Sequence, residues 1–156
     1  HVKGLVHYRV SEAREAQHLL ADLRDELLAL EAVPASERDT TLLVLPHGFA
    51  DFLDFNDLLD PADALIASLG LEGVFQIASF HPKYRFAGTA EDDITNFTNR
   101  APYPTLHLLR EDSISRAVEA FQQAEAIYET NMRTLQALGP EGWQRLDVGP
   151  ATKGAR

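Results

Sequence analysis

Residues 73–80 read Gly-Val-Phe-Gln-Ile-Ala-Ser-Phe, and residues 40–45 read Thr-Thr-Leu-Leu-Val-Leu. Both runs consist mainly of β-branched, aromatic and aliphatic residues, and neither contains a charge. Short uncharged runs of this kind are typical of strands that are covered on both faces. Each run follows a segment with helical spacing, so the sequence predicts an α/β fold in which strands alternate with helices.

The segment before residues 40–45 has the pattern of one long helix. Leucines recur at spacings of three and four from Leu19 to Leu30, which predicts a single apolar stripe. Ser11 is the expected N-cap residue, and Pro34 marks the end. The acidic residues of this helix are interpreted as its solvated face: Glu12, Glu15, Asp22, Asp25 and Glu26.

The remaining elements complete the order β-α-β-α-α-β-loop-β-α. Short strands are expected at residues 5–10 and 105–109, a two-part helical stretch at 48–70, and a long helix from Ser113 to the stop at Gly139-Pro140. We therefore predict one layered α/β domain over residues 1–148, followed by a flexible tail over 149–156. Its sheet is expected to be mixed and mostly parallel, with about four strands. The first three strands should be parallel, and the fourth could run antiparallel.

The same patterns predict which side chains fill the core. Six are expected to be buried in the sheet: Leu42, Val44, Val74, Ile77, Leu106 and Leu108. Eight more are expected on the helices that cover its faces: Leu20, Leu23, Leu27, Phe52, Leu65, Ile66, Val118 and Phe121.

Composition narrows the possible functions. The chain has 156 residues with 14 basic and 24 acidic side chains, a formal charge of −10, and no cysteine. An overall acidic field disfavours binding to nucleic acid or to anionic membranes. No apolar run approaches the roughly 18 residues of a membrane-spanning helix, so we expect a cytoplasmic protein with no membrane partner. The motifs of nucleotide sites, Ser hydrolases and zinc proteases are absent, and the sequence identifies no cofactor.

The chemically unusual part of the chain is the segment from residue 81 to residue 104. It lacks helical or strand periodicity, and loops longer than about 15 residues are usually functional or disordered. Its aromatic residues favour an ordered loop, because their burial offsets the entropy that ordering costs: Tyr84, Phe86, Phe97 and Tyr103. The loop follows the carboxyl end of a central strand, where open α/β sheets bind ligands. We therefore expect the functional site here.

Within and beside this loop, eight residues are candidates for a polar pocket: His81, Tyr84, Asn99, Arg100, Tyr103, His107, Arg110 and Glu111. His81 is the preferred general base, since a histidine needs only a small pKa shift to act near neutral pH. His107 would be a second acid–base group, and the two tyrosines pocket walls or proton donors. The two arginines are suited to holding an anion. This set predicts a small-molecule enzyme acting on an anionic substrate.

Two other functions remain open. The same loop could close over a ligand or partner in a non-catalytic binding or protein-interaction module. Alternatively, His81 and His107 could bind a divalent metal with a carboxylate such as Glu111, although no typical metal-ligand spacing is present. Each residue also has a structural interpretation: His107 as a hydrogen-bonded core histidine, Arg110 paired with a nearby acid, and Arg100 bonded to loop carbonyls. The sequence does not indicate the oligomeric state.

Several blocks resemble the bacterial family known as domain of unknown function 1415, found chiefly in proteobacteria. The resemblance runs over nearly the whole chain and is most specific in the following residues: Gly70 to Pro82, Tyr84, Phe86-Ala87-Gly88, and Asn96-x-Thr98-Asn99-Arg100-x-Pro102-Tyr103-Pro104-x-Leu106-His107-Leu108-Leu109-Arg110-Glu111. Thr40 to Val44 and Phe52 to Phe55 look like earlier blocks. The resemblance implies no particular activity. It implies that Ala101 replaces a usual serine, that His47 lies outside the family pattern, and that members begin with a further helix bearing a Leu-Cys-Pro-Phe-like segment.

Overall fold

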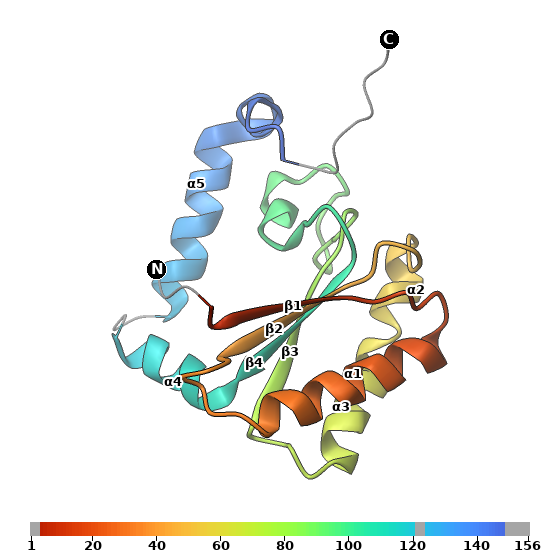
Figure 1. The fold of residues 1–156 in the computed structure, drawn as a ribbon. Coiled ribbons are helices and arrows are strands. Elements are labelled where there is room, and N and C mark those ends of the chain that lie inside the picture. Colours follow the sequence, from red (N-terminus) through yellow and green to blue (C-terminus); the bar gives the residue numbers. More distant parts are fainter. Residues whose placement is uncertain (1–3, 121–123, 149–156) are drawn as a thin grey trace.

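The computed structural model describes residues 4–120 and 124–148, and a four-stranded mixed sheet lies at its centre (Figure 1). The strands are β1 (Val6–Val10), β2 (Thr40–Val44), β3 (Phe75–Phe80) and β4 (Thr105–Arg110). Their order in the sheet is β1-β2-β4-β3. β1 is parallel to β2, whereas β4 is antiparallel to both of its neighbours. The first three strands therefore run in one direction, as predicted, and the fourth strand returns between β2 and β3.

The helices follow the predicted order with shifted boundaries, but the one helix predicted from Ser113 to Gly139 is two helices in the structure. They are α1 (Ala16–Glu31), α2 (Phe52–Asn56), α3 (Leu59–Ser68), α4 (Glu111–Ala120) and α5 (Ala124–Arg145), and a 3-10 helix, η1 (Ile94–Asn99), lies inside the long loop. Gly139, with φ of 64°, interrupts α5 at the predicted stop, and a further short helical piece follows it. The α/β class and the four-stranded sheet are confirmed. The predicted tail, residues 149–156, lies outside the described residues.

Ser11 does not cap α1, in contrast to the prediction. The helix begins five residues later, after Glu15. Ser11 is instead fully buried, where its hydroxyl accepts a hydrogen bond from the Ala13 amide and donates one to Asp22. Ser11 does bond a backbone amide two residues later, as an N-cap residue would, but α1 begins only at Ala16.

The core lies on one face of the sheet, between the strands and the helices α1 and α3. Side chains alternate along a strand, so only every second residue points into this core. Leu106, Leu108, Leu23, Leu27 and Ile66 are buried as predicted. Leu42 and Val44 are only half-buried, because the alternate residues face the helices. These are Thr41 and Leu43 in β2 and Leu45 directly after it.

Two residues predicted to be buried are exposed, and a third lies outside the described residues. Val74 is 44% exposed because it lies just before β3, and Val118 is 41% exposed on α4, which has no buried residue. Phe121 lies outside the described residues. The sequence pattern predicted helices on both faces of the sheet, whereas α1 and α3 pack on the same face.

β1 has an unusual distribution of side chains for an edge strand. Its apolar residues Val6, Tyr8 and Val10 are exposed on the face away from α1, and His7 and Arg9 point toward α1. None of the helices in the described part of the chain is long and apolar enough to cross a membrane.

Candidate functional site

The long loop between β3 and β4 is ordered by its own polar side chains. Asn96 is fully buried, and its side-chain oxygen accepts hydrogen bonds from the Phe86 amide at 3.0 Å and from the Thr89 hydroxyl at 2.9 Å. Its amide nitrogen donates to the Ala90 carbonyl at 2.8 Å. Asp93 caps η1 by accepting from the Thr95 amide, which lowers the pKa of the Asp93 carboxyl. The expected ordering of this loop is confirmed.

His81 joins the loop to the segment that enters α2. The side chain is fully buried between Phe52 and Phe55, with ring centroids 5.5 and 5.2 Å away. Its Nε2 lies 2.8 Å from the carbonyl oxygen of Phe49, and its Nδ1 accepts from the Lys83 amide at 2.9 Å. These partners require the neutral tautomer protonated on Nε2. Burial lowers the pKa of His81, which favours the same neutral form.

The neighbours of His81 are also engaged in the fold. Asn99 donates from its side chain to the Ser79 carbonyl at 3.1 Å, and its own carbonyl accepts from the His81 amide. The Tyr84 ring packs against Phe52 at 5.2 Å between centroids, and burial raises the pKa of its hydroxyl. Tyr84 therefore keeps its proton at neutral pH.

Arg100 is a half-buried candidate that lines two hollows. Its Nε donates to the Tyr84 carbonyl at 3.2 Å and its Nη2 to the Glu91 carbonyl at 2.7 Å. The guanidinium lies 4.3 Å above the Phe97 ring, and Phe97 in turn makes an edge-to-face contact with Trp143 of α5 at 4.9 Å. Burial lowers the pKa of Arg100, but a guanidinium stays charged at neutral pH.

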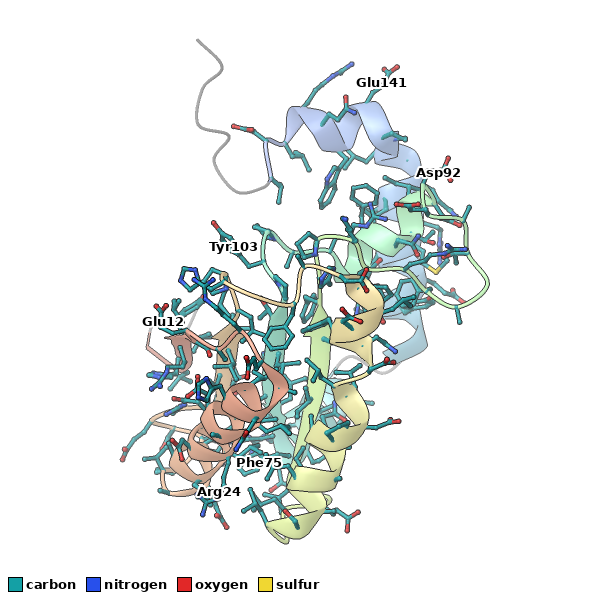
Figure 2. The ribbon with its side chains drawn as sticks, turned by 90° about the vertical axis from the view of Figure 1, so that its right-hand side faces the viewer. Glu12, Arg24, Phe75, Asp92, Tyr103 and Glu141 are labelled. Carbon is teal, nitrogen blue, oxygen red and sulfur yellow. The ribbon has the colours of Figure 1, made fainter. Side chains whose placement is uncertain are left out.

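Three hollows meet at Pro82 on this rim of the sheet, and Figure 2 shows Tyr103 and Asp92 at this end of the molecule, away from Phe75. The first, of about 200 Å³, is lined mainly by Arg100, Phe97, Pro102 and Trp143. The second, of about 450 Å³, continues past Arg100 to Lys83, Glu91 and Asp92. The third, of about 370 Å³, includes His47, Lys83 and Tyr103. Arg100 thus lies between an apolar and a polar hollow.

The structure separates the other predicted residues from this rim. His107 pairs with Leu42 and Ala78 in the sheet and lies beside Phe80, so it points to the opposite face from His81. Its Nε2 is buried and has no hydrogen-bond partner among the described residues. Burial lowers the pKa of His107 as well.

Arg110 and Glu111 lie at the far end of β4. Arg110 donates to the carbonyl oxygens of Leu30, Val33 and Arg38 at 2.7 to 3.3 Å, where it closes the carboxyl end of α1. The Glu111 amide donates to the Val74 carbonyl at the start of α4. Thr105 and Arg110 are the first and last residues of this six-residue strand, so the two ends lie about 17 Å apart. The two arginines therefore do not form one anion site, in contrast to the prediction.

The predicted metal ligands are not brought together. His81 and His107 lie on opposite faces of the sheet, and both nitrogens of His81 are already hydrogen-bonded. Within residues 4–120 and 124–148, no group of three or more His, Cys, Asp or Glu side chains is placed to hold a metal ion.

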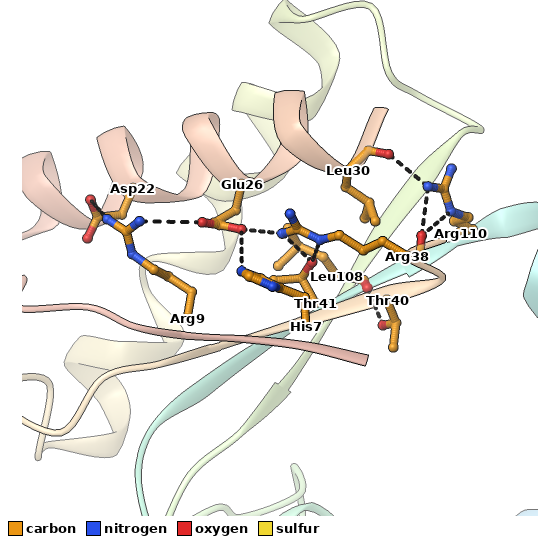
Figure 3. A network of polar contacts seen from close by, with 10 residues as sticks. All are labelled: His7, Arg9, Asp22, Glu26, Leu30, Arg38, Thr40, Thr41, Leu108 and Arg110. Atoms are coloured by element: carbon orange, nitrogen blue, oxygen red, sulfur yellow. Dashed lines mark hydrogen bonds and ion pairs between the residues drawn. The ribbon is translucent and has the colours of Figure 1, made fainter. Parts of the chain in front are cut away.

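A second polar cluster, which sequence analysis assigned to solvent, lies between β1 and α1 (Figure 3). The Glu26 side chain is only 8% exposed and forms an ion pair with Arg38, which also donates to the Thr41 hydroxyl at 2.8 and 3.0 Å. Arg9 lies 3.6 Å from both Asp22 and Glu26. The solvated-face interpretation is therefore wrong for Asp22 and Glu26. Their spacing indicates this position, since both residues lie three or four residues from leucines of the α1 stripe and so share its buried face.

Comparison with known proteins identifies a family but no relative of assigned function. The family model described as "Protein of unknown function (DUF1415)" matches residues 1–145 of the chain. No curated protein and no solved structure matches it.

Proposed function

The chain belongs to the DUF1415 family, and we propose that it binds a small organic anion in the hollow lined by Arg100, Phe97 and Trp143. The observation that carries this proposal is the environment of Arg100. Its guanidinium is partly buried, held in a fixed orientation by two loop carbonyls, and open to a cavity on its remaining side.

Two basic side chains at this rim support an anionic ligand. In a chain with a formal charge of −10, Arg100 and Lys83 line one hollow, together with Glu91 and Asp92. Neither basic side chain takes part in the ion pairs found in the described part of the chain. A preoriented guanidinium is well suited to a carboxylate or a phosphate, because it offers planar donors in a fork.

The apolar walls of the hollow indicate what the rest of the ligand is like. Phe97, Trp143 and Pro102 present ring faces and edges beside the guanidinium. Its volume of about 200 Å³ is below the range of roughly 300–1,000 Å³ of drug-sized sites, so the ligand is small. A compact aromatic acid, such as phenylacetate, has the matching combination of one flat apolar group and one carboxylate.

The hydrogen bonds of His81 favour binding over acid–base catalysis. A general base needs a free nitrogen lone pair within reach of the substrate. The lone pair on Nδ1 of His81 is already used by the Lys83 amide, and the Nε2 proton is directed to the Phe49 carbonyl. Burial raises the pKa of the Tyr84 hydroxyl above its ordinary value, which makes Tyr84 a weaker proton donor. These groups support a rigid binding loop and not a proton-transfer pair.

The single tryptophan makes the proposal directly testable. Since Trp143 is the chain's one tryptophan and lines the hollow, its fluorescence should respond as phenylacetate is titrated into the protein. Arg100→Gln should weaken binding by about 10- to 100-fold, the equivalent of losing charge-assisted hydrogen bonds of roughly 1.5–3 kcal/mol. Arg133→Gln is the matched control, because Arg133 is 73% exposed on α5 and loses the same charge.

Two results would count against the proposal. One is the absence of saturable binding by phenylacetate and by phenyl phosphate at millimolar concentration. The other is equal binding by the Arg100→Gln and Arg133→Gln variants, which would show that the guanidinium does not contact the ligand.

A further inference from the structure

β1 has an open backbone edge in the described part of the chain. It is the terminal strand of the sheet, and within residues 4–120 and 124–148 it pairs with β2 alone (Figure 1). The odd-numbered residues make these bonds, as the carbonyl of Leu5 accepts from the Thr40 amide and the Ser11 amide donates to the Val44 carbonyl. The amide and carbonyl groups of a strand alternate in direction. Those of Val6, Tyr8 and Val10 therefore point to the open edge.

This edge has few of the features that usually prevent strand pairing. Natural edge strands are protected by proline, lysine, bulges or inward-pointing charged residues. β1 has an inward-pointing charge at Arg9, which is paired with Asp22 and Glu26 of the same chain. β1 reads Val-His-Tyr-Arg-Val and pairs with β2 in continuous register, so it contains no proline, lysine or bulge. Its apolar side chains are 41%, 67% and 57% exposed at Val6, Tyr8 and Val10. An edge of this kind favours the addition of another strand.

The sequence of β1 is self-complementary about Tyr8. We propose that a second copy of this chain adds its own β1 antiparallel to this one, across a two-fold axis at Tyr8. Tyr8 would then face Tyr8 of the second copy, and Val6 would face Val10 of the second copy on each side. All three pairs use the outward amide and carbonyl groups, which exchange both hydrogen bonds in such pairs. The result is a continuous eight-stranded sheet with an isologous interface.

The charges under β1 are compatible with a second copy as the occupant of this edge, because they are balanced within each chain. On the other face of β1, His7 would face Arg9 of the second copy, and two basic residues in these positions normally repel each other. Here Arg9 is paired with Asp22 and Glu26, and His7 lies 3.8 Å from Glu26. Each copy therefore brings its own carboxylates to the axis, and the repulsion is offset within each chain. This gives the polar cluster under α1 a function beyond holding the helix to the sheet.

The experiment compares variants of Tyr8, whose amide does not bond to β2. The unaltered chain should sediment as a dimer, at twice its mass of 17.3 kDa. Tyr8→Pro removes the outward N–H and should weaken dimerisation at least about tenfold, while proline is tolerated at an edge position of this kind. Tyr8→Thr keeps the N–H and is the matched control for loss of the ring. Tyr8→Lys places like charges opposite each other and repeats the test should the proline variant not fold.

A cross-linking measurement locates the axis. The chain has no cysteine, and facing Cα atoms in a hydrogen-bonded antiparallel pair are about 5.5 Å apart, within disulfide range. Tyr8→Cys should therefore oxidise to a covalent dimer much faster than Leu53→Cys, a control at a residue that is 70% exposed on α2. Monomeric sedimentation of the unaltered chain overturns the proposal, as does dimerisation that Tyr8→Pro and Tyr8→Lys leave intact. Equal oxidation rates of the two cysteine variants overturn it as well.

Discussion

Arg100 and Arg110 lie near opposite ends of β4, and they show how differently one residue type can be used. Arg110 donates to three carbonyl oxygens at the end of α1 and contacts the Phe75 ring at 5.5 Å. Arg100 donates to two loop carbonyls and lines a cavity. Both side chains are half-buried, and Arg100 has a cavity beside it with room for a ligand. The difference indicates that Arg110 stabilises the fold and that Arg100 is available for binding.

The largest effect is expected at Arg110. Arg110→Gln removes charge-assisted hydrogen bonds to Leu30, Val33 and Arg38 and leaves their carbonyls without this donor, which should lower the free energy of unfolding by about 2–4 kcal/mol. Urea denaturation of the variant and of the unaltered protein measures this difference in the free energy of unfolding. Arg145→Gln, at an 80% exposed residue, should stay within about 0.5 kcal/mol of the unaltered protein. A loss of stability for Arg110→Gln as small as that of the control would contradict a stabilising role for Arg110.

The next effect concerns Glu26, which belongs with Arg110 as a structural group. Glu26→Gln leaves the nearly buried Arg38 without its carboxylate and should cost about 2 kcal/mol in the free energy of unfolding. Glu129→Gln, on an exposed surface pair of α5, is the matched control and should be nearly neutral. If both variants unfold at the same urea concentration, the polar cluster under α1 contributes little to stability.

A smaller effect follows from the buried histidines. Burial lowers the pKa of His81 and of His107 in the folded state, so the unfolded chain binds more protons below the ordinary histidine pKa of 6.5. Their contribution to stability is complete above pH 6.5 and is lost as the pH falls toward the folded-state pKa. Urea midpoints measured from pH 7.5 down to pH 5 should therefore decrease.

Variants of His81 and His107 show how much of this pH dependence comes from each histidine. His81→Gln keeps a donor toward Phe49 without a titratable ring, and His107→Leu removes the second imidazole; each should flatten the curve in part. A stability that rises as the pH falls would contradict the neutral, hydrogen-bonded state of His81.

The smallest effect on stability is expected at Arg100, and it sharpens the contrast with Arg110. Arg100→Gln should lower the free energy of unfolding by less than about 1 kcal/mol, because its contacts are partly solvated. The same variant should weaken phenylacetate binding, followed by Trp143 fluorescence, by about 10- to 100-fold. A loss of stability equal to that of Arg110→Gln would mean that the two arginines have the same structural role.

Sequence reasoning was most successful where the determining interactions are local. The leucine stripe of α1, the break at Gly139 and the ordered loop with its aromatic residues all depend on near neighbours in the chain. It failed where partners come from distant segments. His81 bonds to a carbonyl 32 residues away, and Arg110 bonds to one 80 residues away. No local pattern distinguishes these bonded side chains from free ones.

By itself, the sequence determined the α/β class, the order of the elements, the direction of the first three strands and the location of an ordered polar loop. Periodicity and turn residues encode these features over a few residues at a time. Only the tertiary structure decided that β4 lies between β2 and β3, which sends His107 to one face and Arg110 to the far end. The pairing of strands depends on the packing of the whole chain. It is this pairing that divided one predicted cluster and left Arg100 beside the cavity.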